Sequence, residues 1–169
     1  IMLSKDQIKA AAARTVVEQE LEAQGLRALG WREVPTNEEC LGPIALETIP
    51  QFFHLFIGCD DLPSAQFNAK LYMARRKAEL ALSDDVDFYV ASMSDNVISY
   101  KGLLMPVDLP KFFLDLANSE LETAICVFHQ RFSTNTSPRW PLAQPFRMLA
   151  HNGEINTVMG NRNWSVART

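Results

Sequence analysis

Two stretches in the first half of the chain carry apolar residues at helical spacing. The first begins at Ser4, which fits a helix N-cap, and continues to about Ala23, where Gly25 follows as a helix stop. Its apolar positions are Ile8, Ala12, Val16, Val17 and Leu21. The second lies within residues 60–82, with Ser64 as its cap. Its apolar positions are Phe67, Leu71, Ala74, Ala78 and Leu82, and this stripe predicts an amphipathic helix.

Runs of aliphatic and aromatic residues predict β-strands. They cover residues 26–35, 51–59, 86–93 and 96–104. The run 51–59 is apolar on nearly both faces, which is typical of an interior strand. The last two runs meet at the turn-forming residues 94–96 and predict a hairpin. Residues 36–50 predict a connection with a short helical turn, and residues 109–117 a short helix.

A further strand is predicted at residues 124–133, where apolar and polar positions alternate. In a strand, one face would carry Ile125, Val127, His129, Arg131 and Ser133. This face turns from apolar to polar, as in a strand that begins in the core and ends at a cleft. Residues 145–155 predict its partner strand, and residues 155–167 a helix or helical turn. Because helices alternate with hairpin-like pairs of strands, we expect an α+β fold with antiparallel pairing.

The composition is that of an ordinary globular domain. Of the 169 residues, 47% are hydrophobic and 21% charged, which fits one domain with a sizeable core. The net charge of −4 argues against a nucleic-acid or anionic-membrane partner. No apolar run approaches the roughly 20 residues of a membrane helix, and the start shows no signal-peptide pattern. The three widely spaced cysteines form neither a disulfide framework nor a metal pair, so we expect a reducing, cytoplasmic location.

The polar residues with the clearest chemistry lie between residues 125 and 163. Arg131 could bind a carboxylate bidentately, as an amino-acid substrate requires, but from the residues alone an ion pair with a nearby Asp or Glu is the favoured explanation. Asn152-Gly153 could form a tight turn. The same pair could also form an oxyanion hole, from the Asn amide and the Gly backbone N–H. Spacing alone does not choose between these readings.

The other candidates have plainer explanations. His129 and His151 lie in apolar strand-like runs and are expected to be buried, structural histidines. Glu154 is expected to cap the following helix. Cys126 is expected in the core and unreactive. Cys40 and Cys59 lie near turns and could be exposed thiols, but no basic cluster adjoins them.

Residues 129–164 carry a family resemblance. Their sequence is HQRFSTNTSPRWPLAQPFRMLAHNGEINTVMGNRNW. It resembles the glutamine amidotransferase domain of the glutamate synthase large subunit, a class II amidotransferase of the N-terminal-nucleophile hydrolase type. The motifs RFSTNT, WPLAQPFR and AHNGEINT carry the resemblance, and GWREVP and YKGLL are similar to the same family. It therefore extends over the whole chain and is weakest over residues 1–30.

The resemblance implies both a fold and a set of roles. The fold is a four-layer αββα sandwich of two antiparallel sheets between helices. Arg131 is assigned to the α-carboxylate of glutamine, and Asn152 with the backbone N–H of Gly153 to the oxyanion hole. His129 and His151 remain structural.

The catalytic nucleophile of this family has no counterpart in the chain. In the family it is a cysteine at the first residue of the mature protein, activated by its own α-amino group. The first residue here is Ile1, and none of the three cysteines fits that position. We therefore expect residues 1–169 to be one partial amidotransferase domain, without the N-terminal nucleophile segment and the C-terminal remainder. The isolated chain is expected to be inactive.

The resemblance also implies what the intact enzyme does. Glutamine would be hydrolysed to glutamate and ammonia, and a synthase domain of the same polypeptide would use the ammonia for reductive amination of 2-oxoglutarate. FMN and an iron–sulfur cluster are implied for the intact enzyme, with no cofactor or metal in this segment. A small NADPH-oxidising subunit is a further candidate partner.

Two other functions fit part of the pattern. Another class II amidotransferase would share the Arg and the Asn-Gly pair, but would not be expected to carry WPLAQPFR or GNRNW. A non-catalytic ligand-binding relic would keep the scaffold without the nucleophile.

Overall fold

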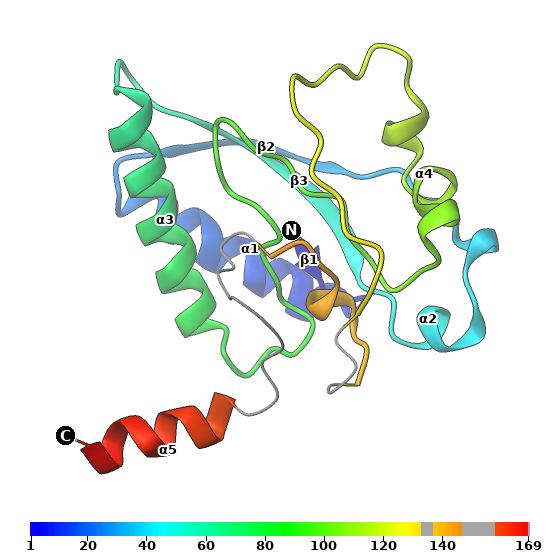
Figure 1. Cartoon of the computed structure of the whole chain (residues 1–169). Coiled ribbons are helices and arrows are strands. Elements are labelled where there is room, and N and C mark those ends of the chain that lie inside the picture. Colours follow the sequence, from blue (N-terminus) through cyan, green and yellow to red (C-terminus); the bar gives the residue numbers. More distant parts are fainter. Residues whose placement is uncertain (133–136, 147–157, 169) are drawn as a thin grey trace.

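A three-stranded antiparallel sheet lies at the centre of the computed structural model, which describes residues 1–132, 137–146 and 158–168 (Figure 1). The strands are β1 (Met2–Leu3), β2 (Arg27–Glu33) and β3 (Gln51–Gly58), in the order β1-β3-β2. The strands predicted at 26–35 and 51–59 are confirmed, and the second is the central one. With its helices, this sheet makes the fold α+β.

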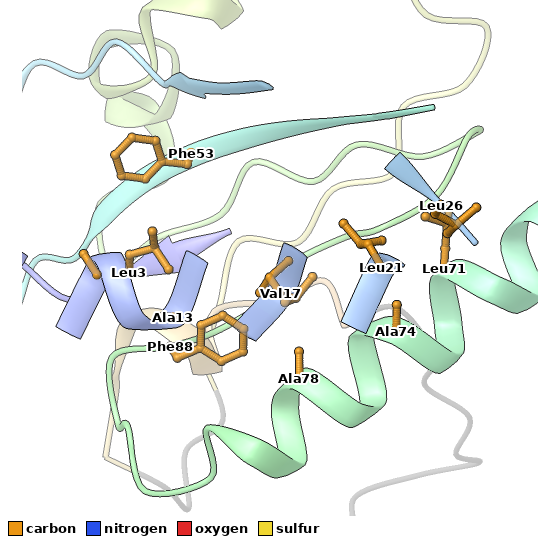
Figure 2. Packing of buried hydrophobic residues seen from close by; sticks show 12 residues of the cluster. Leu3, Ala13, Val17, Leu21, Leu26, Phe53, Leu71, Ala74, Ala78 and Phe88 are labelled. Atoms are coloured by element: carbon orange, nitrogen blue, oxygen red, sulfur yellow. The ribbon is translucent and has the colours of Figure 1, made fainter. Parts of the chain in front are cut away.

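Two long helices, α1 (Gln7–Glu22) and α3 (Ser64–Ala81), pack against each other and against one face of the sheet. Figure 2 shows Val17 and Leu21 of α1 close to Leu71 and Ala74 of α3. Both predicted helices are thus confirmed. None of the helices within the described ranges is long and apolar enough to cross a membrane.

The details of these helices differ from the sequence-based expectation. Asp6, not Ser4, caps α1, because its Oδ1 accepts hydrogen bonds from the backbone N–H groups of Ile8 and Lys9 at 2.8 and 3.2 Å. The buried stripe of α1 is Ala10, Ala13, Val17 and Leu21, and Ile8 is exposed. Small alanines on this face allow close approach to α3. Ser64 is the first residue of α3 and supplies no capping hydrogen bond.

The hairpin predicted at 86–104 is wrong. This segment is irregular, and its one bridge joins Tyr89 to Met2. Small polar side chains bind amides that a strand ladder would otherwise use. The Ser92 hydroxyl accepts a hydrogen bond from the backbone N–H of Ser99 at 3.1 Å, and such local bonds compete with sheet pairing.

Short helices surround a second hydrophobic core on the other side of β3. They are η1 (Glu38–Cys40), α2 (Pro43–Glu47), η2 (Pro106–Asp108), α4 (Leu109–Phe112), η3 (Leu114–Ala117) and η4 (Trp140–Leu142). The helical turn in 36–50 is confirmed. The helix predicted at 109–117 is present as α4 and η3, interrupted at Phe113. Phe52, Phe112, Phe113 and Trp140 meet in this core.

The strand predicted at 124–133 is also wrong over the described residues 124–132. These residues are irregular and exposed up to Arg131. A strand needs a partner for its backbone groups, and none lies along 124–132 within the described structure. The proposed partner, 145–155, falls mostly outside the described residues. The helix that follows is α5 (Val158–Arg168).

Candidate functional site

Arg131 lies exposed on the irregular segment that follows η3. Its backbone N–H donates a hydrogen bond to Nδ1 of His129 at 3.0 Å. Among the described residues, no carboxylate lies within ion-pair distance of its guanidinium group. The simple ion-pair explanation therefore has no support in the described structure.

His129 and Cys126 do not have the surroundings expected of them. Both were expected to be buried, and both are exposed. The same holds for their apolar neighbours Val127 and Phe128, each 75% exposed. The cause is the missing strand pairing described above, because alternation along a strand buries one face only when a second layer covers it.

Asn152 and Gly153 lie outside the described residues, as do His151 and Glu154. What the structure does describe is the chain that leads to them. There Trp140 is buried, and its indole Nε1–H donates a hydrogen bond to the carbonyl oxygen of Ala45 at 3.2 Å. Its ring centroid lies 5.5 Å from that of Phe52 and 5.6 Å from that of Phe112. Trp140 thus fixes the start of this chain to the second core.

Lys101 and Gly102 contact the same stretch of residues, 140–146. The Lys101 ammonium donates a hydrogen bond to the carbonyl oxygen of Pro141 at 3.0 Å and lies 4.8 Å from the centroid of the Phe146 ring. A Cβ on Gly102 would lie 2.6 Å from the Trp140 ring. Sequence reasoning assigned no role to this pair. The only signal for it was the similarity of YKGLL to the family.

A polar cluster lies on the face of the sheet that is turned away from α1 and α3. Arg32 donates two hydrogen bonds to the carboxylate of Asp115, at 2.7 and 2.6 Å, and Tyr100 donates a third at 3.0 Å. Hydrogen bonding to Arg32 holds the pKa of Asp115 below its usual range. Burial raises the pKa of Tyr100 to about 12, and burial together with the nearby positive charge of Arg32 lowers the pKa of His54.

This cluster borders a cavity of about 390 Å³ between β3 and residues 91–101. His54 and Tyr100 line the cavity, together with mostly apolar side chains. Arg131 does not line it, so the structure does not bring the predicted carboxylate-binding residue to this cavity. The ion pair joins residues 83 positions apart, and no local sequence signal could have indicated it.

The cysteines show no sign of a nucleophilic or metal site. Cys40 is half-buried, and its thiol donates a hydrogen bond to the carbonyl oxygen of Asn37 at 3.2 Å. Cys59 is also half-buried, rather than the exposed thiol that its turn-like position allowed. Within the described residues, no group of three His, Cys, Asp or Glu side chains could hold a metal ion.

The comparison with known families decides the identity of the chain. The sequence pattern described as "Glutamine amidotransferases class-II" matches residues 1–169, the whole length. The chain belongs to the class II glutamine amidotransferases. This membership agrees with the motifs between residues 131 and 163.

Known members of this amidotransferase family resemble the chain closely. It is 44% identical over 161 residues to "Ferredoxin-dependent glutamate synthase" of Cyanidium caldarium, covering 92% of this chain and 10% of that protein. It is 45% identical over 159 residues to "Glutamate synthase [NADPH] large chain" of Azospirillum brasilense, again 92% and 10%. The chloroplastic/mitochondrial "Ferredoxin-dependent glutamate synthase 1" of Arabidopsis thaliana is 42% identical over 172 residues, covering 99% and 11%. The chain spans about a tenth of the length of these curated relatives.

Proposed function

We propose that this amidotransferase chain is part of the glutaminase domain of a glutamate synthase, which hydrolyses glutamine to glutamate and ammonia. The observation that carries the proposal is the match of all 169 residues to the class II family, together with relatives at 41–45% identity that are named glutamate synthase. Other class II amidotransferases would share the Arg and the Asn-Gly pair, but the relatives named here are all glutamate synthases.

Arg131 binds the substrate in this proposal. Its guanidinium would grip the α-carboxylate of glutamine through two parallel hydrogen bonds, and each charge-assisted bond is about twice as strong as a neutral one. Its exposure, and the lack of a carboxylate partner within the described residues, support this role. A structural arginine would be expected to have its charge already paired.

Asn152 and Gly153 stabilise the reaction intermediate in this proposal. Attack of a cysteine thiolate on the side-chain amide of glutamine forms a C–S bond and places negative charge on the carbonyl oxygen. The Asn152 amide N–H and the Gly153 backbone N–H would donate hydrogen bonds to that oxygen. Collapse breaks the C–N bond, the leaving nitrogen takes up a proton to become ammonia, and water then hydrolyses the thioester to glutamate.

The nucleophilic cysteine is proposed to lie outside these 169 residues. Cys40 and Cys59 are half-buried. Cys126 is exposed, and among the described residues His129 is the one base near it in the sequence. None of them has the free α-amino group that activates an N-terminal nucleophile. We therefore propose that residues 1–169 are part of a larger amidotransferase domain.

The complete architecture is proposed to be a four-layer αββα sandwich. One helix layer and one sheet layer in the described structure support this, because α1 and α3 cover one face of the antiparallel sheet. The exposed apolar residues 125–128 fit a second sheet that would cover them in the complete domain. A crystal structure of the full-length gene product that shows residues 124–132 unpaired would refute this architecture.

The ammonia is proposed to serve a synthase domain of the same polypeptide, where 2-oxoglutarate is reductively aminated. FMN and an iron–sulfur cluster would supply electrons there. The described residues contain no cluster of metal-binding side chains, so they do not fit the iron–sulfur group. Ferredoxin- and NADPH-named relatives match almost equally well, at 44% and 45% identity. This is expected if the present domain does not contact the electron donor or an NADPH-oxidising subunit.

A glutaminase assay tests the proposal directly. The full-length gene product should release ammonia and glutamate from glutamine and form a thioester that hydroxylamine can trap. The 169-residue chain alone should release none, because it lacks the nucleophile. Absence of glutaminase activity in the full-length product would overturn the function and favour a non-catalytic ligand-binding role. Activity of the 169-residue chain would overturn the assignment of the nucleophile.

A further inference from the structure

One edge of β3 is paired over only a short part of its length. On this edge β1 pairs with Gln51 and Phe52. The next pair is Ile1 and Phe53, in which the backbone nitrogen of Ile1 donates a hydrogen bond to the Phe53 carbonyl at 2.7 Å and the Phe53 N–H donates one back at 2.8 Å. Along residues 54–58, no strand within the described ranges covers this edge. An uncovered edge presents a row of backbone donors and acceptors to which another strand can bind.

The cavity of about 390 Å³ lies along the same edge. Residues 53–57 line one side of it, and residues from the stretch 91–101 line the other. Leu71, from the core between α1, α3 and the sheet, and Phe113, from the second core, also line the cavity. The space beside β3 therefore reaches both hydrophobic cores.

β1 has a second neighbour on its other edge. The Met2 N–H donates a hydrogen bond to the Tyr89 carbonyl at 2.7 Å, and the Tyr89 N–H donates one to the Met2 carbonyl at 3.1 Å. Both pairings of β1 are antiparallel. A chain that continued β1 in front of Ile1 would thus run beside residues 54–58 on one edge and residues 91–93 on the other. These two stretches belong to the two walls of the cavity.

We propose that the cavity receives the upstream segment, the five residues that precede Ile1 in the full-length gene product, as a continuation of β1. This inference rests on the proposed function, which places further sequence before Ile1. Five residues match the stretch 54–58 of β3. In the register of β1, the second residue before Ile1 lies opposite Leu55 and the third lies opposite Phe56. Because hydrogen-bonded and non-hydrogen-bonded pairs alternate, the pair with Leu55 exchanges two hydrogen bonds and the pair with Phe56 none.

This placement restricts the sequence of the upstream segment. A strand that passes between two cores is covered on both faces, and such strands consist of nearly continuous apolar residues. Proline has no N–H to donate and is excluded from the middle of a sheet. The three residues nearest to Ile1 should therefore be uncharged and should not include proline. A proline or a charged residue among them in the gene sequence would contradict the proposal.

Disulfide cross-linking in the full-length gene product tests the register. One variant carries a cysteine at the third residue before Ile1 together with Phe56→Cys, at a position that is 54% exposed and tolerant of substitution. The Cα atoms of a non-hydrogen-bonded antiparallel pair lie about 4.5 Å apart, which a disulfide can span. The matched control keeps the upstream cysteine and carries Ile57→Cys, whose side chain points to the opposite face of the sheet. After mild oxidation and digestion, mass spectrometry should detect about tenfold more of the linked peptide in the Phe56 variant than in the control.

Hydrogen exchange of the unmodified full-length protein gives a second measurement, which needs no variant to fold. The N–H groups of Leu55 and Ile57 point to the same edge as that of Phe53, because N–H directions alternate along a strand. We expect both amides to exchange slowly, as paired amides of a central strand do. Fast exchange at Leu55 and Ile57 would show that the edge stays open and would overturn the proposal.

The outcomes separate this inference from the proposed function. Slow exchange without the Phe56 cross-link, or with equal cross-linking in the two variants, means that a different segment covers the edge and overturns the assignment of the upstream segment. Glutaminase activity of the wild type is measured separately. An active protein without the cross-link overturns only the strand, and an inactive protein with the cross-link overturns only the proposed function.

Discussion

Leu71 in α3 is 2% exposed, whereas Phe128 in the segment after η3 is 75% exposed. Leu71 belongs to a framework, residues 1–81, in which α1, α3 and β3 cover one another's apolar faces. Phe128 belongs to the signature segment, residues 125–163, whose motifs define the family. Its apolar residues 125–128 find no cover within the described structure.

The two regions differ in what their residues contribute, which is folding stability in the framework and proposed catalytic groups in the signature segment. The framework buries apolar area, which is the main source of folding free energy. The signature segment instead presents Arg131 at the surface and carries Asn152. Substitutions of buried framework residues should therefore change the free energy of unfolding and leave catalysis alone. Substitutions of Arg131 and Asn152 should do the reverse, whereas Trp140 of the same segment is buried in the second core.

The largest expected effect is that of Asn152→Ala on catalysis. Loss of one oxyanion-hole donor should lower the glutaminase kcat of the full-length gene product by about a hundred- to a thousandfold. The free energy of unfolding should change little. The control is Asn118→Ala, an exposed position in the connection after η3. Steady-state kinetics and urea unfolding would check both, and an unchanged kcat would remove Asn152 from the oxyanion hole.

Leu71→Ala should have the largest effect on stability. A buried leucine replaced by alanine loses about 2–5 kcal/mol of unfolding free energy, through lost transfer energy and the cavity left behind. Leu80→Ala, in the same helix but 64% exposed, should cost far less. Urea unfolding of the two variants measures the contrast. Equal losses would show that α3 does not pack as described.

Arg131→Met should weaken glutamine binding. Hydrogen bonds to charged groups contribute about 1.5–3 kcal/mol, so KM should rise by about ten- to a hundredfold. Unfolding free energy should stay constant, because Arg131 has no ion-pair partner in the described structure. Arg139→Met, also exposed and in the same stretch, is the control and should leave KM unchanged. A stability loss without a change in KM would favour a structural role for Arg131.

Gly102→Ala tests the contact between the two regions. The added methyl would lie 2.6 Å from both the Trp140 ring and Leu104, and overpacking of this kind typically costs about 1–3 kcal/mol. At Gly30 an added methyl would meet nothing within 4 Å, so Gly30→Ala should be nearly neutral. Thermal unfolding of both variants decides. Equal stability of the Gly102→Ala and Gly30→Ala variants would mean that Trp140 does not pack on Gly102.

Asp115→Asn should have the smallest effect, one that depends on pH. The pKa of Asp115 is held low by Arg32, so the stabilisation is present above the unfolded-state pKa and is lost as pH falls through the folded-state pKa. The loss at pH 7 should be below about 1 kcal/mol, as for other partly exposed ion pairs. The difference in unfolding free energy between the wild type and Asp115→Asn should vanish in acid, where the Asp115 carboxylate is protonated. Unfolding curves between pH 7 and 3 measure it, with the exposed Asp60→Asn as control.

The hydrophobic pattern determined the elements that carry a clear apolar run or stripe. The runs predicted β2 and β3, although residues 34–50 with η1 and α2 lie between them, and the helical stripes predicted α1 and α3. The motifs likewise determined the family, because they consist of particular residue types, such as Arg131 and Asn152, that can be recognised in the sequence without a structure.

Only the tertiary structure decided the contacts between distant segments. The Arg32–Asp115 ion pair and the contact from Lys101 to Pro141 join residues 83 and 40 positions apart. The predicted hairpin at 86–104 did not form, because Ser92 and other small polar side chains bind its amides locally. A strand pattern states which face could be buried. Whether it is buried depends on a covering layer that no local sequence window contains.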